Sequence, residues 1–433
     1  MMDETQAPDR IDAQPGGLAL DPPARAPAAP QHPQAAGLPL RRFAKVQNVL
    51  EMRTRARKAM PRAVFDFIDG AAEQEISRRR NRSQFDNWGF VHRVGVDVSR
   101  VDMSVELFGD TYDAPFGIGP TGLAGLAWPK AETLIAQGAK AANIPFCLST
   151  VSSVRLEEVA ESAGAGLWFQ LYIFRDRGLS RELVSRAKKA GYKALVITVD
   201  CATGGNRERD PRNDFTLPLR PTLRSAFDTL KRPGWIGRLV ANGAPRPENM
   251  VEAAAKAARN AQGLVVFMSE QLDPSVTWDD VEEFVDLWDG PVIIKGVLST
   301  EDAERAVKAG ADGLILSNHG GRQLDGAVSS LHVLERVRDA VGPAPTIFCD
   351  GGFRRGADIL KAKALGANVV LMGRNTLYGV GAAGRPGVDH VIHLLKTEVE
   401  RALVLLGVPR VSDLTRDHLM DMSRLPPAPA KAD

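Results

Sequence analysis

Eight short apolar runs alternate with segments of helical pattern, and this alternation restricts the fold more than any other feature of the sequence. The apolar runs are residues 115–119, 145–149, 167–172, 194–198, 291–295, 312–317, 346–350 and 368–373. Apolar side chains at helical spacing lie between them, at residues 130–142, 154–162, 181–190, 281–287, 300–309, 329–341 and 355–365. Strands that alternate with helices predict an α/β fold, and this number of strands predicts a (β/α)8 TIM barrel. A doubly wound open sheet is the main alternative.

The regions outside this alternation divide the chain further. Residues 1–37 are rich in Pro, Ala and Gln and contain few large apolar side chains, so we expect a disordered extension there. We expect one folded domain over residues 38–415 and a C-terminal tail at residues 416–433. Residues 211–273 are too long for an ordinary strand-to-helix connection. They predict an insertion on the active face of the barrel, after the fourth strand.

Composition and charge exclude several classes of protein. The formal net charge of +2 argues against a nucleic-acid-binding protein, which usually has a large basic excess. Cys147, Cys201 and Cys349 are far apart and odd in number, so we interpret them as reduced thiols, neither a disulfide framework nor a metal set. No apolar run reaches the roughly 20 residues that cross a bilayer, and the N-terminus has no signal-peptide pattern. We therefore expect a cytoplasmic protein.

Residues 317–326, with the sequence SNHGGRQLDG, connect an apolar run to a helical segment. His319 and Arg322 then lie on a strand-to-helix loop, which is where barrels of this kind build their active sites. A histidine can take or give a proton near neutral pH, and an arginine can form paired hydrogen bonds with a carboxylate. Gly320 and Gly321 allow a positive φ or the close approach of a ligand. A solvated loop with a surface histidine is the alternative.

Two glycine-containing motifs follow the last two predicted strands. DGGFRRG begins at Asp350 and MGR ends at Arg374, at the positions where barrels bind phosphate through glycine amides and a helix N-terminus. Arg354 and Arg374 add positive charge there. For any single residue at a strand end, a structural hydrogen bond is an equally good explanation. Together, these residues predict a cofactor that bears a phosphate.

These motifs, together with TVD at residues 198–200, resemble the FMN-dependent α-hydroxy acid oxidases and dehydrogenases, and the (S)-mandelate and L-lactate dehydrogenases most of all. The resemblance covers about residues 40–414. It implies a TIM barrel with an N-terminal helical cap, formed by residues 42–82. It also implies FMN as the cofactor, oxidation of an L-2-hydroxy acid to the 2-oxo acid, and a homo-oligomer, which is commonly a tetramer in this family.

The resemblance assigns a role to individual residues. It implies that His319 is the base and that Asp200 orients it. The positions that match the substrate-binding set are Arg322, Tyr172 and Arg207, with Arg209 as the alternative to Arg207. The positions that match contacts with the flavin ring are Pro120, Thr121, Gly122, Ser149, Gln170, Thr198, Lys295 and Ser317. The positions that match the phosphate side are Asp350, Gly351, Gly352, Arg354, Gly373 and Arg374. A cation at Lys295 tunes the flavin, whereas a lysine that points to solvent is the alternative.

The sequence departs from the family, or leaves alternatives open, at four points. The string VFDF has Phe67 where the family has a substrate-binding tyrosine. PTG, with Gly122, resembles the dehydrogenases, which pass electrons to a quinone or cytochrome; the oxidases, which use oxygen, commonly have alanine there. A flavin-binding protein without turnover is a third hypothesis, against which the retention of His319, Asp200 and Arg322 argues. Residues 219–240 mix apolar and basic side chains, which suits either a peripheral contact with the inner face of the membrane or a lid over the site.

Overall fold

The computed structural model describes residues 43, 45–215, 222–251 and 270–424. The chain divides into two units, Met1–Pro39 and Leu40–Asp433, and all described residues belong to the second unit. The extension predicted at residues 1–37 lies outside the described residues. So do residues 425–433 of the predicted tail and parts of the predicted insertion.

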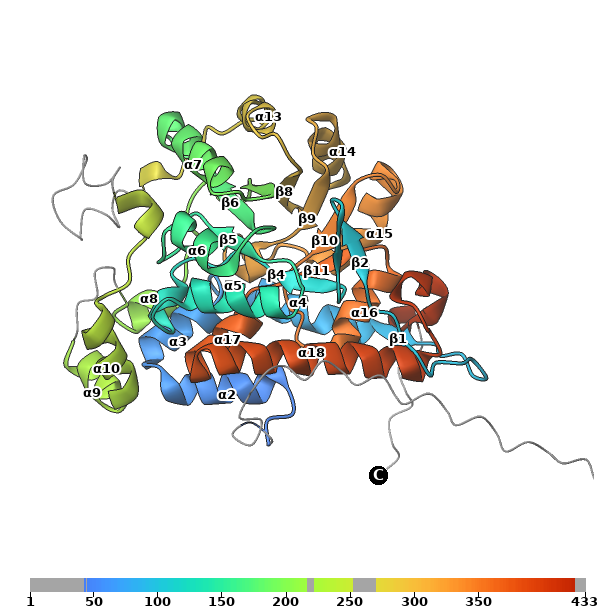
Figure 1. Ribbon diagram of the computed structural model, residues 1–433, viewed down its shortest axis with the longest axis horizontal. Helices are drawn as coiled ribbons and strands as arrows, with labels where there is room; N and C mark the ends of the chain where they lie inside the picture. Colours follow the sequence, from blue (N-terminus) through green and yellow to red (C-terminus); the bar gives the residue numbers. More distant parts are fainter. Residues whose placement is uncertain (1–42, 44, 216–221, 252–269, 425–433) are drawn as a thin grey trace, which may run out of the picture. The chain divides into compact units, whose positions relative to one another are not determined.

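Eight parallel strands form the centre of the structure, with helices around them (Figure 1). They are β4 (Phe116–Ile118), β5 (Cys147–Ser149), β6 (Trp168–Tyr172), β7 (Ala194–Thr198), β8 (Val292–Val297), β9 (Gly313–Leu316), β10 (Thr346–Cys349) and β11 (Val369–Met372). The strand order is β4-β11-β10-β9-β8-β7-β6-β5. A parallel bridge between Ile118 and Phe146 joins β4 to β5, the two ends of this order. The predicted TIM barrel is confirmed, and the open-sheet alternative is wrong because the sheet closes.

Helices follow the strands and cover the outside of the barrel. The helices at predicted positions are α5 (Ala131–Ala141), α6 (Leu156–Ala163), α7 (Arg177–Lys189), α13 (Trp278–Asp286), α14 (Thr300–Lys308), α15 (Ser330–Val341) and α16 (Gly356–Ala364). Helix α7 begins earlier than residue 181 because Asp176 caps it, accepting a hydrogen bond from the amide of Leu179 at 3.1 Å. Two helices after the last strand, α17 (Arg374–Ala383) and α18 (Arg385–Leu406), are absent from the sequence-based prediction.

Among the described residues, three helices that precede the barrel form the expected cap: α2 (Val49–Ala59), α3 (Arg62–Asp69) and α4 (Ile76–Ser83). Asp69, at the end of α3, is buried and accepts hydrogen bonds from Arg53 (2.6 Å), Arg78 (2.9 Å) and the hydroxyl of Tyr378 on α17 (2.7 Å). Burial opposes ionisation of this carboxyl, but its partners hold the pKa of Asp69 well below its usual range. The cap is thereby fastened to the helix that follows the eighth barrel strand.

Two short antiparallel sheets accompany the barrel. One pairs β2 (Val105–Leu107) with β3 (Asp110–Tyr112), and its Leu107 and Tyr112 belong to the same buried cluster as inward-facing side chains of the barrel. The other pairs β1 (Trp88–Phe90) with β12 (Leu419–Asp421). Because β12 falls within residues 416–433, the folded structure continues past the domain boundary predicted at residue 415.

The described part of the insertion after β7 contains α8 (Arg209–Arg212), α9 (Leu223–Leu230) and α10 (Pro233–Asn242). Helices α9 and α10 lie beside each other, near α3 and α8 (Figure 1). The amide of Arg62 donates a hydrogen bond to Asp228 on α9 at 2.6 Å, and the indole of Trp235 on α10 donates one to the carbonyl of Leu126 at 2.9 Å. These bonds fix the two helices to the cap and to the barrel.

Candidate functional site

The interior of the barrel changes from apolar to polar along the strands. Inward-facing side chains alternate along each strand, and the deeper ones form a buried apolar cluster that includes Cys147, Trp168, Val196, Ile293, Ile315, Phe348 and Leu371. Two residues further along, the same positions are Ser149, Gln170, Thr198, Lys295, Ser317, Asp350 and Gly373. The predicted site residues therefore form one ring at the carboxyl ends of the strands, where TIM barrels bind ligands.

A cavity opens at this ring. It is lined by most of the predicted cofactor residues, namely Pro120, Thr121, Gly122, Ser149, Lys295, Asp350, Gly351, Gly352, Arg354, Gly373 and Arg374. Tyr172, His319 and Arg322 of the predicted substrate set line it as well. Asp200 and Arg207 do not line the cavity, but Asp200 contacts His319 and the Arg207 guanidinium lies 5.7 Å from the ring of Phe67. The structure thus brings most of the two predicted sets together around one space, although Gln170, Thr198 and Ser317 of the cofactor set are not among its lining residues.

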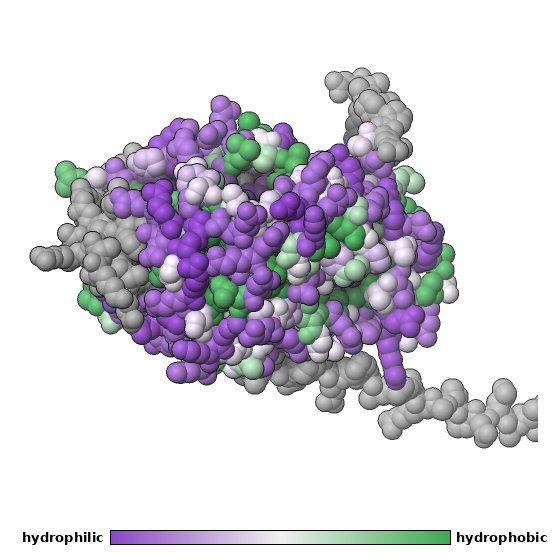
Figure 2. Space-filling model, turned by 90° about the horizontal axis from the view of Figure 1, so that it is seen from above, coloured by the Kyte–Doolittle hydropathy of each residue, from purple (hydrophilic) through white to green (hydrophobic). Residues whose placement is uncertain are grey.

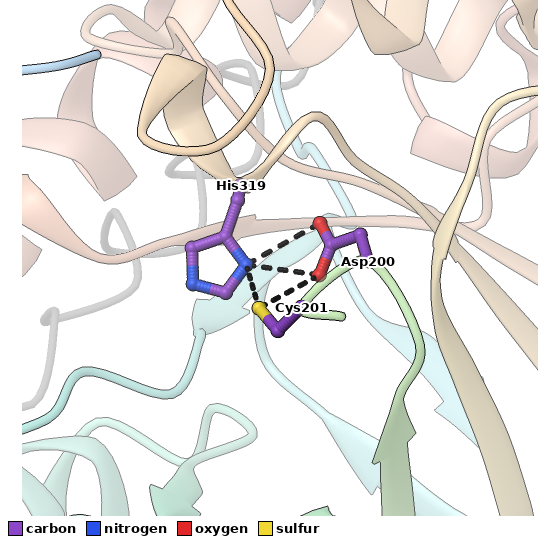
Figure 3. A group of neighbouring side chains, drawn as sticks. All are labelled: Asp200, Cys201 and His319. Atoms are coloured by element: carbon purple, nitrogen blue, oxygen red, sulfur yellow. Dashed lines mark hydrogen bonds and ion pairs between the residues drawn. The ribbon is translucent and has the colours of Figure 1, made fainter. Parts of the chain in front are cut away.

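His319 and Asp200 form a hydrogen-bonded pair (Figure 3). The Nδ1 atom of His319 lies 3.0 Å from Oδ1 and 3.3 Å from Oδ2 of Asp200. Burial opposes ionisation of Asp200, but His319 and Lys295 outweigh it and hold the pKa of this carboxyl far below its usual range. The ionised carboxylate therefore fixes a proton on Nδ1 and leaves Nε2 as the ring nitrogen that can accept a proton.

The loop that carries His319 is held from both sides. The backbone amide of His319 donates a hydrogen bond to Ser317 Oγ at 2.9 Å, and His319 has a φ of +56°, which is rare for a residue other than glycine. The amide side chains of Asn318 and Asn81 on α4 exchange two hydrogen bonds of 2.7 Å. Asp325 accepts hydrogen bonds from the amides of Ile76 and Ser77 at the start of α4. The cap therefore holds the base in a conformation that the loop alone does not favour.

Lys295 is a buried cation at the floor of the cavity, and only 3% of it is exposed. Strand register aligns it with Thr198 on β7 and, one strand further, with Tyr172 on β6. Its Nζ donates a hydrogen bond to Ser317 Oγ at 3.1 Å and lies 3.5 Å from Asp350 Oδ2. Burial acts to lower the pKa of Lys295, but Asp350 and Asp200 outweigh it and raise the pKa above its ordinary value. The alternative of a lysine that points to solvent is wrong.

Several polar atoms of the ring are buried without a hydrogen-bond partner in the described part of the chain. They are Gln170 Nε2, Thr198 Oγ1 and Asp350 Oδ1. Gln170 is oriented by Ser149, whose hydroxyl donates to Gln170 Oε1 at 3.2 Å. A buried polar atom without a partner costs about 1–3 kcal/mol, so this set fits a ligand that supplies donors and acceptors along its edge.

The end of the cavity near Arg354 and Gly352 is suited to bind an anion. Burial lowers the pKa of Arg354, and Arg78, Arg82 and Arg53 lower it further. Arg354 forms no ion pair with a carboxylate among the described residues. Gly352, with φ +88°, approaches the cap so closely that a Cβ there would lie 1.9 Å from the carbonyl oxygen of Asn81. Gly373 is the N-cap residue of α17, and the N-terminus of this helix contributes a favourable dipole.

Arg374 has a second role in addition to the predicted one. Its guanidinium donates hydrogen bonds to the carbonyls of Ile68 (3.0 Å), Gly320 (3.0 Å) and Gly70 (2.7 Å). These bonds join α17 to the cap and to the loop of His319. Three N–H groups are used in this way, and a guanidinium has five, so two remain for an anion in the cavity.

Arg322 and Phe67 line the cavity, and Arg207 lies beside Phe67. The ring of Phe67 lies 5.2 Å from the Arg322 guanidinium and 5.7 Å from that of Arg207. Burial lowers the pKa of Arg322 well below its usual value, and Arg207 and Arg374 lower it further. Arg209, the alternative to Arg207, instead pairs with Asp66, Asp69 and Glu75 of the cap. Of the two arginines, Arg207 is thus the one beside Phe67, and its contact with the substrate stays a prediction.

The comparisons with known proteins agree with this geometry. Residues 56–421 match the family model described as FMN-dependent dehydrogenase. The chain belongs to the FMN-dependent dehydrogenase family. It is 41% identical to (S)-mandelate dehydrogenase from Pseudomonas putida over 86% of this chain and 94% of that protein. It is 39% identical to L-lactate dehydrogenase from Actinobacillus pleuropneumoniae serotype 5b (strain L20) over 88% of this chain and all of that protein.

Among solved structures, that of the monotopic membrane protein (S)-mandelate dehydrogenase superposes with a TM-score of 0.84. The sequence identity is 41%, and the match covers 87% of this chain and 99% of that one. The protein is therefore an FMN-dependent oxidoreductase with a TIM-barrel fold.

The cavity fits FMN on its own chemistry. The partnerless atoms of Gln170 and Thr198 suit the polar edge of an isoalloxazine ring, and Lys295 suits the end of that edge that carries negative charge when the ring is reduced. The glycines after β10, together with Arg354 and the N-terminus of α17, suit the phosphate.

Sequence reasoning missed four residues at this site. Arg78, Asn81 and Tyr378 line the cavity from the cap and from α17. No pattern distinguishes Arg78 from the arginines beside it, because only the folded cap determines which one points inward. Cys201 follows Asp200 directly in the sequence, and that position could have been noticed. Its Sγ lies 3.6 Å from His319 Nδ1, and burial raises the pKa of this thiol, which is therefore protonated.

Proposed function

We propose that the protein oxidises an L-2-hydroxy acid with a large apolar side chain to the corresponding 2-oxo acid, and passes the electrons to a quinone or a cytochrome. The observation that carries the proposal is the His319–Asp200 pair, which opens onto the same cavity as the buried Arg322. The names of the similar mandelate and lactate dehydrogenases support this substrate class.

Each residue of the site has its own role in the reaction. Arg322 and Arg207 bind the substrate carboxylate, which offsets the repulsion that Arg207 and Arg374 exert on the buried Arg322 guanidinium. Burial, together with Cys201 and Asp200, raises the pKa of Tyr172 far above its usual value, so its hydroxyl stays neutral and can donate a hydrogen bond to the substrate. His319 Nε2 takes a proton from the substrate, and Asp200 stabilises the imidazolium that results. FMN supplies the two-electron acceptor for the oxidation.

Anaerobic titration of the purified protein tests this proposal. Addition of (S)-mandelate or L-lactate should bleach the visible flavin absorbance, and a quinone analogue should restore it. A flavin that no 2-hydroxy acid reduces would leave a flavin-binding protein without turnover as the better description. Reoxidation that is faster with oxygen than with the quinone analogue would favour the oxidase alternative.

Phe67 sets the preference among substrates. A tyrosine here could donate a hydrogen bond to the substrate carboxylate, and such bonds to charged groups contribute about 1.5–3 kcal/mol. A large side chain compensates through burial, at about 25 cal/mol per Å², whereas the methyl group of lactate has little to bury. We therefore expect Phe67→Tyr to raise kcat/KM for lactate by roughly 10-fold or more and to raise kcat/KM for mandelate less.

Phe67→Leu is the matched control, because it changes the ring without adding a hydroxyl. It should not improve lactate oxidation. Equal gains for lactate and mandelate in Phe67→Tyr would mean that the residue does not select between them through the carboxylate.

We also propose that the described part of the insertion contacts the cytoplasmic face of the membrane. Leu223, Phe227 and Leu230 share one face of α9 and are 94%, 64% and 69% exposed. Lys231 follows them directly, which suits the boundary between lipid and headgroups. On the face shown in Figure 2, in comparison, apolar residues form small patches among polar ones. None of the described helices is both long enough and apolar enough to cross a bilayer.

Replacing Leu223, Phe227 and Leu230 together with serine should move most of the protein from the membrane fraction to the soluble fraction. Each side chain contributes about 1.5–3 kcal/mol when it is fully buried in an apolar phase. Val94→Ser with Leu405→Ser is the matched control, because these residues are also exposed but lie outside the insertion. Equal partition of the wild type and the α9 variant in cell fractionation would favour the lid alternative.

We also propose that the protein is a homo-oligomer. Light scattering on the purified protein tests this proposal by measuring its mass in solution.

A further inference from the structure

Cys201 lies against the His319–Asp200 pair and forms a compact cluster with it (Figure 3). Its Sγ is 3.6 Å from His319 Nδ1 and 3.4 Å from Asp200 Oδ1, and the nitrogen and Oδ1 are 3.0 Å apart. One nitrogen, one sulfur and one carboxylate oxygen therefore face one another, all within 4.8 Å. The proposed reaction uses the nitrogen and the oxygen of this cluster but leaves the sulfur without a role.

The spacing of these three atoms matches that of ligands around a tetrahedral zinc ion. Bonds of about 2.0–2.1 Å to nitrogen and oxygen and about 2.3 Å to sulfur separate tetrahedral ligands by about 3.3–3.6 Å. The two distances from Sγ, 3.6 and 3.4 Å, lie within that range, and the 3.0 Å between Nδ1 and Asp200 Oδ1 is about 0.3 Å below it. Thiolate with imidazole selects zinc and similar thiophilic ions over magnesium and calcium, which prefer oxygen ligands.

A second cavity adjoins Cys201, and most of its lining differs from that of the flavin cavity. It is lined by Cys201 and by residues that include Val199, Trp278 and Val297, and its volume is about 250 Å³. It shares Tyr172 with the flavin cavity, and Thr198 of the predicted flavin set lines it too, but His319 does not. An ion can therefore approach Cys201 through a space that His319 does not line.

The charges around the cluster are compatible with a cation. Asp200 supplies a carboxylate oxygen, the thiol becomes a ligand by releasing its proton to solvent, and the neutral imidazole becomes one by shifting its single proton from Nδ1 to Nε2. Lys295 is the cation that acts on both Asp200 and Cys201. Its charge is compensated by Asp350, whose Oδ2 lies 3.5 Å from the Lys295 Nζ.

We propose that Asp200, Cys201 and His319 form a binding site for zinc, and that zinc bound there inhibits the enzyme. The ion replaces the hydrogen bond between His319 Nδ1 and Asp200. The neutral imidazole then carries its proton on Nε2, where it can no longer take one from the substrate. Zinc binding itself does not depend on the proposed function, whereas the inhibition rests on it.

Equilibrium dialysis of the FMN-loaded protein against zinc chloride tests the site. The wild type should bind one zinc ion that Cys201→Ala and Cys201→Ser bind more weakly, by at least the roughly 10- to 100-fold that loss of an outer-shell partner costs. Serine keeps the size and the hydrogen bond of the thiol but is a poor zinc ligand. An unchanged flavin spectrum and circular dichroism spectrum in the variants establishes that they are folded. Equal zinc affinity in the wild type and both variants would overturn the site.

Anaerobic flavin reduction by (S)-mandelate tests the inhibition. Zinc should slow this reduction in the wild type, and a chelator should restore it, while the same concentration of magnesium has no effect. Each Cys201 variant is compared with its own rate without zinc, and zinc should leave that rate unchanged. Zinc that binds through Cys201 without slowing reduction would overturn the inhibitory role. If no 2-hydroxy acid reduces the flavin of the wild type, the proposed function fails, and dialysis still decides whether the zinc site exists.

Discussion

The His319→Ala variant is expected to keep FMN bound. Its flavin should be reduced by substrate about 100- to 10,000-fold more slowly than the flavin of the wild type, which is the usual cost of losing a general base. The side chain lies at the edge of the cavity, and the partnerless ring atoms and the arginines that fit FMN belong to other residues. Loss of the imidazole therefore removes the proton acceptor and leaves the cofactor site in place. Stopped-flow measurement of flavin bleaching under anaerobic conditions gives the rate directly.

Asp200→Asn is the matched comparison, because it keeps the shape of the side chain and removes its charge. It should slow flavin reduction clearly but less than His319→Ala, since the base remains but its orientation and its imidazolium lose support. Both variants should show the same flavin content as the wild type. A wild-type rate of reduction in His319→Ala would exclude this residue as the base.

The barrel and its ring of polar residues could be predicted from the sequence because both follow from a strict spacing. Each barrel strand has a two-residue alternation, so an apolar residue such as Ile293 determines that Lys295 points to the same side. The motifs at the strand ends then identify the ring as a site. Local pattern alone is enough for these statements, because the closed barrel brings all the strand ends to one place.

The contribution of the cap could not be predicted in the same way. Asn81 exchanges hydrogen bonds with Asn318, which is far from it in the sequence, and Arg78 reaches the cavity only because α4 lies against the loop of His319. Such contacts depend on the relative placement of two helices, which no local spacing encodes. The second role of Arg374, which holds cap carbonyls, has the same origin.

The cluster around Cys201 is missed by the sequence prediction for a different reason. The separation of the three cysteines along the chain indicates no site shared among them, and Cys147 and Cys349 are both buried. The partners of Cys201 are instead a histidine and an aspartate from two different strand ends. The sequence signal for such a cluster is a set of different metal-ligating residue types at neighbouring strand ends, here aspartate, cysteine and histidine.

Arg354→Ala is expected to weaken FMN binding by about 10- to 150-fold, the loss of one hydrogen bond to a charged group at about 1.5–3 kcal/mol. Arg354 is the informative residue because Arg78, Arg82 and Arg53 surround it and it has no carboxylate partner among the described residues. An anion at this point relieves that repulsion, so the FMN phosphate gains more from Arg354 than from an exposed arginine. Released FMN is measured by its fluorescence after ultrafiltration at a series of protein concentrations.

The next residue in the sequence provides the control. Arg355 has the same side chain, but its guanidinium pairs with Glu398 at 3.0 Å and is about half exposed, away from the cavity. Arg355→Ala should therefore keep its FMN, although both arginines belong to the same motif. The double variant Arg354→Ala with Arg374→Ala should lose more FMN than Arg354→Ala alone, since it removes both cations predicted to hold the phosphate and also the bonds from Arg374 to the cap. Full FMN occupancy in the double variant would mean that the phosphate lies elsewhere, because no buried site retains a doubly charged group after losing both of its principal cations without a cost in affinity.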